Sequence, residues 1–163
     1  MEHERRYIIR ANINSPIFVS KDHEPSYHDA MIYNVSREGM CLGAGRNFDR
    51  GEHFFIRLHE SVPGFESMSP YEACVAEVKW CSRKDSESYR MGVRQIGKAT
   101  VVNKKDIDIS VLSCDACGNS RVYKVIKTDD YIHLCLNCYA WMARMNGNAM
   151  KDTLTRYILG NVV

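Results

Sequence analysis

Four of the seven cysteines form two closely spaced pairs in the last third of the sequence. Cys114-Asp-Ala-Cys117 is followed by 17 residues and then by Cys135-Leu-Asn-Cys138. Two residues between cysteines let both thiolates face one ion from a tight turn, and Gly118 supplies a permissive backbone just after the first turn. Pairs separated by about 15 to 20 residues are typical of a structural zinc site. Four thiolates complete the tetrahedron, so we expect the zinc to stabilise the fold without taking part in catalysis.

Two other interpretations use the same cysteines. A redox CxxC normally begins a helix within a βαβ unit, but only Cys135 to Cys138 precedes a predicted helix and the βαβ context is missing. Iron would use the same four thiolates, and the sequence does not separate it from zinc. Because four cysteines already saturate the site, we expect the nearby His133 to be an ordinary strand residue. The other cysteines lie in apolar runs and are predicted to be small core residues: Cys41, Cys74 and Cys81.

Two polar motifs lie in the first quarter of the sequence. The segment Glu4-Arg-Arg-Tyr-Ile-Ile-Arg10 places Arg6 and Arg10 four positions apart. After 23 further residues comes Asn34-Val-Ser-Arg-Glu-Gly39, an N-x-S-x-x-G sequence expected at a turn between two strands. Alone, the first motif is typical of a solvated basic tail and the second of an Asx or Ser turn. Their combination in this order is more specific than either.

The combined pattern, RxxxR followed after some tens of residues by (D/N)xSxxG, resembles the PilZ domain family of cyclic di-GMP receptors. The resemblance covers about residues 4–97, because Val78-Lys-Trp80, a polar loop and Tyr89-Arg-Met-Gly-Val93 are similar to the closing hairpin of a PilZ barrel. It implies a six-stranded β-barrel and a bacterial, cytoplasmic receptor. Cyclic di-GMP and a downstream protein are the implied partners.

The resemblance also implies a role for each motif residue. Arginine binds phosphate oxygens bidentately and suits guanine O6 and N7, so Arg6 and Arg10 would take phosphate and guanine. The Asn34 carbonyl can accept from guanine N–H groups, Ser36 adds a short polar contact, and Gly39 lets the strand approach the ligand. The implied ligand-binding residues are Arg5, Arg6, Arg10, Asn34, Ser36 and Gly39.

Two features of the sequence differ from the strongest form of the family pattern. Asn34 is within the D/N choice, but its neutral amide lacks the charge-assisted hydrogen bond of aspartate, which predicts a lower affinity. The aromatic residue usual after the Gly-Val step is replaced by Arg94-Gln-Ile96. We also expect the segment before residue 11, which has few apolar anchors, to become ordered over the barrel when the nucleotide binds.

The elements that must position these motifs are mainly β. Short apolar or alternating runs between turn residues predict six strands and no helix from residue 11 to about 97. The expected strands are 14–20, 28–35, 39–43, 53–58, 71–82 and 89–96. A closed barrel is the expected arrangement because it leaves no exposed edges. The proline-containing stretch 60–70 is expected to be a long surface loop.

The pattern changes after the barrel. Residues 98–112 are expected to be a connector, and 121–126 with 131–134 a second hairpin between the cysteine pairs. Helical spacing of apolar residues after Tyr139 predicts two helical segments with a break at Gly147. The expected division is a barrel domain with its arginine segment over 1–100, a connector over 101–112, and a zinc-ribbon-like module with a terminal helix over 113–163.

Composition limits the possible functions. The chain has 163 residues, with 22 Lys and Arg against 20 Asp and Glu, which is too balanced for a protein that coats DNA or an anionic membrane by charge alone. We find neither an apolar run long enough to span a membrane nor a secretion signal at the N-terminus, so we expect a cytoplasmic protein with no membrane insertion.

The motifs and the composition distinguish three classes of function. A non-catalytic cyclic di-GMP receptor explains both sets of motifs. A zinc-ribbon adaptor for protein or nucleic acid, with a barrel that no longer binds nucleotide, is the alternative; its basic residues Arg144, Lys151 and Arg156 are sparse, so nucleic acid is the less favoured partner. An enzyme is not expected, because no P-loop, HExxH, G-x-S-x-G or open metal site is present.

Overall fold

The computed structural model describes residues 10–58, 72–103, 113–129 and 131–145. Its barrel strands are β1 (Ala11–Lys21), β2 (His28–Val35), β3 (Met40–Ala44), β4 (His53–Leu58), β5 (Glu72–Arg83) and β6 (Tyr89–Asn103). Three further elements follow: β7 (Lys124–Lys127), β8 (His133–Leu134) and α1 (Leu136–Ala143). Each of the six expected barrel strands is present at its predicted place, with ends that differ by a few residues except in β6.

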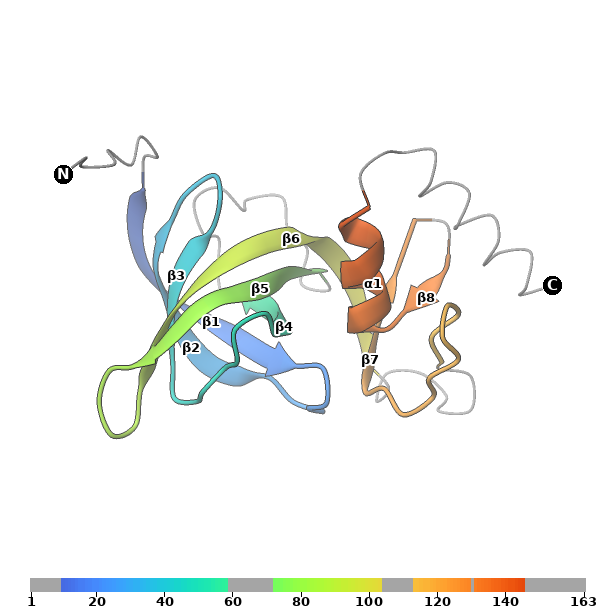
Figure 1. Cartoon of the computed structure of the whole chain (residues 1–163), viewed down its shortest axis with the longest axis horizontal. Coiled ribbons are helices and arrows are strands. Elements are labelled where there is room, and N and C mark those ends of the chain that lie inside the picture. The colour runs from blue at the N-terminus through green and yellow to red at the C-terminus, as the bar shows by residue number, and fades with distance from the viewer. Residues whose placement is uncertain (1–9, 59–71, 104–112, 130, 146–163) are drawn as a thin grey trace.

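The six long strands close into an antiparallel barrel. Their order is β3-β2-β1-β4-β5-β6, and the additional pairing of β3 with β6 joins the two ends (Figure 1). In that closing pair Cys41 lies opposite Gly92 and Met40 opposite Val93. Closure leaves neither β3 nor β6 as a free edge, so backbone groups that an open edge would leave unpaired are hydrogen-bonded in this pair. The mainly β fold predicted from the sequence is therefore confirmed.

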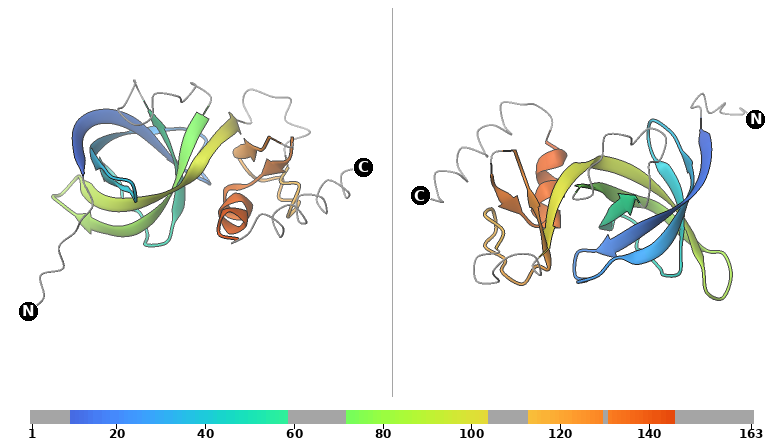
Figure 2. Two further views of the ribbon diagram at one scale, coloured as in Figure 1. Left: turned by 90° about the horizontal axis from the view of Figure 1, so that it is seen from above. Right: turned by 180° about the vertical axis from the view of Figure 1, so that it is seen from behind.

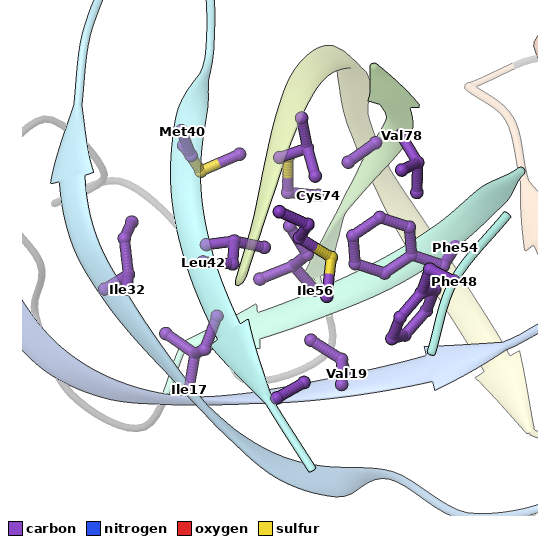
Figure 3. Packing of buried hydrophobic residues seen from close by; sticks show 14 residues of the cluster. Ile17, Val19, Ile32, Met40, Leu42, Phe48, Phe54, Ile56, Cys74 and Val78 are labelled. Atoms are coloured by element: carbon purple, nitrogen blue, oxygen red, sulfur yellow. The ribbon is translucent and has the colours of Figure 1, made fainter. Parts of the chain in front are cut away.

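The barrel interior is filled by alternate residues of its strands. Phe54, Ile56 and Leu42 are fully buried there, and the rings of Phe48 and Phe54 pack with centroids 4.8 Å apart. Figure 3 shows Ile17, Leu42 and Ile56 pointing into the same space from β1, β3 and β4. The interior is apolar and closely packed, so a polar ligand must bind outside it.

The opposite faces of β4 and β5 are buried as well. Ala73 and Val75 alternate with the interior residues Cys74 and Ala76, yet they belong to a separate apolar cluster that includes Phe55. This second cluster also contains Ala99, Val101, Ile126 and Leu136, so it lies between the barrel and the later elements. Burial on both faces explains why the expected alternation in β5 is weak.

Strand β6 is longer than expected because it serves both parts of the chain. Its last residues, Thr100 to Asn103, pair with β7, where the sequence analysis expected a connector from residue 98 onward. Figure 2 shows β6 leaving the barrel and continuing beside α1. The apolar residues Val101 and Val102 explain the extension, since they pack against the clusters on either side. The part after the barrel is thus held against it by a shared strand.

The remaining expectations vary in outcome. The second hairpin is confirmed as β7 and β8, and the first predicted helical segment as α1. The loop at 60–70 and the second helical segment lie outside the described residues.

Cys74 is fully buried, as expected, whereas Cys41 and Cys81 are only partly buried. Among the residues that the structure describes, none forms a helix long and apolar enough to span a bilayer.

Candidate functional site

An open pocket of about 610 Å³ lies where the start of β1, the β2–β3 turn and the middle of β5 and β6 meet. Four of the residues singled out in the sequence line it: Arg10, Asn34, Ser36 and Gly39. The two motifs are therefore brought to one place, although 23 residues separate them in the chain. Arg5 and Arg6 lie outside the described residues.

The β2–β3 turn presents its polar groups in a fixed geometry. The backbone N–H of Ser36 donates to the Gly39 carbonyl over 2.8 Å, and the Ser36 hydroxyl donates to the same oxygen over 3.3 Å. Asn34 is anchored by pairing with Asn12 on one side and Cys41 on the other. Because the Ser36 hydroxyl hydrogen is engaged locally, its oxygen remains available as an acceptor.

Gly39 is required by strand packing. A Cβ atom built at this position would lie 2.2 Å from the Val93 carbonyl oxygen, which is a severe clash with the backbone of β6. The family resemblance implies that this glycine allows close approach of the ligand. The structure adds a second reason, because β3 and β6 can close the barrel here only if the position has no side chain.

Trp80 is a pocket residue that the sequence analysis did not select. It lies opposite Gly92 in the β5–β6 ladder, and 47% of its surface is exposed although it is a large aromatic residue. A Cβ atom at Gly92 would lie 2.1 Å from Trp80 Nε1, so the missing side chain makes room for the indole to pack against β6 at this position. In the sequence, Val78-Lys-Trp80 was interpreted only as part of the closing hairpin. The signal that could have identified Trp80 as a pocket residue is a tryptophan opposite a glycine in that hairpin.

A second group of pocket residues is cationic. Lys79 and Arg94 both line the pocket, and both bind the carboxylate of Glu77, over 2.8 Å and 2.9 Å. Burial acts to raise the pKa of Glu77, but the hydrogen bonds from Lys79 and Arg94 hold it below its usual range. Glu77 is therefore ionised and fixes the position of both cations. With Arg10 and Arg37, they give the pocket an excess of positive charge suited to an anion.

The four predicted metal ligands form one cluster. The sulfur atoms of Cys114, Cys117, Cys135 and Cys138 all lie within 4.8 Å of one another. Cys117 Sγ and Cys135 Sγ are 3.9 Å apart, close to the ~3.8 Å that Zn–S bonds of about 2.3 Å impose in a tetrahedron. Gly118 has φ +73°, so it provides the left-handed residue expected after the first pair.

The electrostatics of the cluster also fit a bound cation. The hydrogen bond from the Cys135 thiol, followed by those from backbone N–H groups, lowers the pKa of Cys114 to about 4. Burial raises the pKa of Cys138 to about 12, and the hydrogen bond with Cys114 raises that of Cys135. A divalent metal would stabilise all four thiolates together. The four sulfur donors fit a metal ion that is bound tetrahedrally by thiolates.

The loop around the first pair is tied to the second hairpin. The His133 N–H donates to Asp115 Oδ2 over 2.7 Å, and the Asp115 N–H donates to the His133 carbonyl over 2.8 Å. His133 is a residue of β8, as expected, and its contact is with Asp115. Cys135 lies between the end of β8 and the first residue of α1. The hairpin and the beginning of α1 therefore place both cysteine pairs.

A closed six-stranded antiparallel barrel with a cationic pocket on its outer wall defines this chain as a small β-barrel protein with an anion-attracting site. The model of the PilZ domain family matches residues 2–108, and the chain belongs to that family. No curated protein matches it in sequence.

Two solved structures match part of this chain. The inhibitor of motility MotI/DgrA of Bacillus subtilis has 19% identity and a TM-score of 0.41, over 56% of this chain and 42% of that one. The PilZ domain of YcgR from Escherichia coli, solved with c-di-GMP, has 18% identity and a TM-score of 0.37, over 56% of this chain and 78% of that one. This chain thus matches less than half of the MotI chain.

Proposed function

We propose that this protein is a non-catalytic receptor for cyclic di-GMP in the bacterial cytoplasm, which changes conformation on binding and passes the signal to a partner protein. The observation that supports this most directly is that Arg10, Asn34, Ser36 and Gly39 line one cationic pocket. Membership of the PilZ domain family supports the same ligand. A cyclic dinucleotide carries two phosphates and two guanines, so it needs both cations and amide-type hydrogen-bonding groups.

The pocket divides these tasks between its two walls. On the side of β1 and the β2–β3 turn, Arg10 takes a phosphate or a guanine edge, and the Asn34 carbonyl accepts from guanine N–H groups. Ser36 accepts a further hydrogen bond from the ligand. We include Arg5 and Arg6, which precede the described residues, as the groups that complete this wall when the nucleotide binds.

On the side of β5 and β6, Trp80 offers the face of its indole to a guanine. Base stacking on an exposed aromatic ring is a common way to bind an unpaired base, and it needs no particular base sequence. Lys79 and Arg94 lie beside it and offer charge to the phosphates. This wall, absent from the sequence motifs, gives the site its aromatic component.

The four cysteines would hold a structural zinc ion. Bound there, the ion joins the two cysteine pairs and so fixes β8 and α1 against the long end of β6. It would leave no coordination position for a substrate. We also propose that residues 1–100 and 113–163 are the two functional units, with 101–112 between them.

The decisive experiment is a calorimetric titration of the protein with cyclic di-GMP. Micromolar binding is expected for the wild type, weakened about 10- to 100-fold in Arg10→Ala and Asn34→Ala because each variant loses charge-assisted or guanine-edge hydrogen bonds. Arg50→Ala is the matched control, since Arg50 is exposed in the barrel but does not line the pocket. A wild type that does not bind would overturn the receptor and favour the zinc-ribbon adaptor.

The expected conformational change has its own test. If the segment before residue 11 orders over the pocket, saturating cyclic di-GMP will slow its proteolysis. Equal cleavage rates with and without the nucleotide would contradict this step while leaving the binding result unaffected.

A further inference from the structure

Glu77 on β5 forms ion pairs with cationic side chains from both the barrel and α1. Its side chain is largely buried, and three cationic groups surround it: Lys79 Nζ at 2.8 Å, Arg94 Nη2 at 2.9 Å and Arg144 Nη2 at 3.7 Å. Lys79 and Arg94 line the nucleotide pocket, whereas Arg144 is the C-cap of α1. One carboxylate therefore connects the pocket with the helix that begins at the four-cysteine cluster.

The two arginines share one oxygen of that carboxylate. Lys79 binds Oε1, while Arg94 and Arg144 both approach Oε2. Arg144 is held in this position by His53, whose Nε2 lies 2.9 Å from Arg144 Nη2. Burial, followed by the charge of Arg144, lowers the pKa of His53, so the ring is neutral and can accept from the guanidinium. Arg144 is therefore positioned to donate to Glu77 Oε2 when Arg94 leaves that oxygen.

Sharing an oxygen makes the two arginines interdependent. When Arg94 turns toward a ligand phosphate, Glu77 loses a hydrogen bond and would be left as a poorly compensated, largely buried carboxylate. A second cation at the same oxygen reduces that cost. Without Arg144, Glu77 holds Arg94 more tightly and the ligand must compete harder for it.

We infer that Arg144 is a positioning residue for the nucleotide site: acting through Glu77, it releases Arg94 toward the phosphate of the ligand and couples pocket occupancy to the four-cysteine part of the chain. This inference rests on the proposed function, because it concerns the affinity of that same pocket. The coupling is reciprocal, so bound nucleotide must strengthen the Glu77–Arg144 contact and hold α1 more firmly against the barrel. The end of α1 is then the place where a downstream protein can sense the nucleotide.

The test is a double-mutant cycle read by calorimetric titration with cyclic di-GMP. Arg144→Gln is expected to weaken binding about two- to fivefold, the range for a partly exposed ion pair. In the Glu77→Gln background the same substitution is expected to change the dissociation constant by less than about 1.5-fold, because the shared carboxylate is gone. Arg144→Lys should recover part of the affinity. Arg121→Gln, an equal charge change at an exposed residue that does not line the pocket, should have no effect.

The cycle separates the possible outcomes. Equal weakening by Arg144→Gln in both backgrounds would mean a general effect of charge or folding and would overturn the inference. Unchanged affinity of Arg144→Gln in the wild-type background would overturn it as well, while the receptor itself stands. A wild type that binds no nucleotide would overturn the receptor and this inference together. If Glu77→Gln does not fold, Arg94→Gln replaces it, since the effect of Arg144→Gln must vanish there too.

Discussion

The ammonium group of Lys124 on β7 lies 2.6 Å from Ser20 Oγ on β1, which joins two residues 104 positions apart. Lys124 is completely buried, and it also donates to the backbone carbonyls of Lys21 and Glu24. Its charge lies near the ring of Tyr27, 5.4 Å from the centroid. This lysine therefore fastens the four-cysteine part of the chain to the β1–β2 loop of the barrel.

Replacement of that lysine should destabilise the protein. Lys124→Met keeps the length of the side chain but removes the ammonium that donates to Ser20 Oγ and to the Glu24 carbonyl, which is expected to lower the free energy of unfolding by about 1–3 kcal/mol. Lys127→Met on the same strand is the control, because Lys127 is only partly buried and contacts the Tyr131 ring; a change within about 1 kcal/mol is expected. Urea denaturation measures both, and equal stability of Lys124→Met and wild type would contradict the expectation.

Lys124 also predicts a pH dependence. Burial lowers its pKa from 10.5 to about 8, with Asp22 and Glu24 opposing the shift. Between these two pH values the unfolded chain holds a proton that the folded chain has released, so this residue makes stability rise with pH. Compared with Lys124→Met, the wild type should gain stability from pH 8 to about 10.5 and show no such relative change below pH 8. If the difference in free energy of unfolding between the wild type and Lys124→Met stays constant or decreases across this pH range, the buried ammonium is not titrating there.

The contact between β3 and β6 predicts a sharp difference between two glycines. Gly39→Ala places a methyl group against the Val93 carbonyl, so a strand must move, and a loss of about 1–3 kcal/mol in stability is expected. Gly45→Ala is the control, because its nearest contact would be the Glu87 carbonyl oxygen at an ordinary 3.6 Å. Thermal melting with circular dichroism compares them. If Gly39→Ala melts with the wild type, the strands are not as close as the structure shows.

The stacking role of Trp80 can be read from binding and fluorescence together. Trp80→Ala is expected to weaken cyclic di-GMP binding by about 10- to 100-fold, the effect of losing one stacked base, and Trp80→Phe to weaken it less. Trp141→Phe provides the control, because Trp141 is exposed but does not line the pocket. Nucleotide should quench the emission of Trp141→Phe and leave that of Trp80→Phe unchanged. Quenching that persists in Trp80→Phe would place the base elsewhere.

Metal removal is expected to loosen the four-cysteine part of the chain. Purified protein should contain about one zinc per chain, and Cys135→Ser should lose most of it, because zinc binding contributes directly to folding energy. Leu136 and Ile126 cover the outer face of β5, so loss of the metal should also lower the melting temperature of the barrel. Cys81→Ser, outside the cluster, should retain the metal. Wild-type protein with far less than one zinc per chain would contradict the assignment.

The sequence alone determined the features that depend on local spacing. Two CxxC pairs separated by 17 residues specify their own turns, and alternation of apolar residues over short runs specifies strands, so the cysteine cluster and the barrel strands could be predicted. The RxxxR and N-x-S-x-x-G motifs likewise predicted one shared pocket, because a family resemblance links them. Each of these signals lies within a short stretch of chain.

Tertiary structure decided what depends on contacts between distant strands. Trp80 became a pocket residue only through its register opposite Gly92, and the extension of β6 only through pairing with β7. A lysine is almost never fully buried without partners, and Lys124 is buried because residues about a hundred positions earlier supply them. Hydrogen-bond partners and burial are set by packing between segments, and no periodicity along the chain encodes which segments meet.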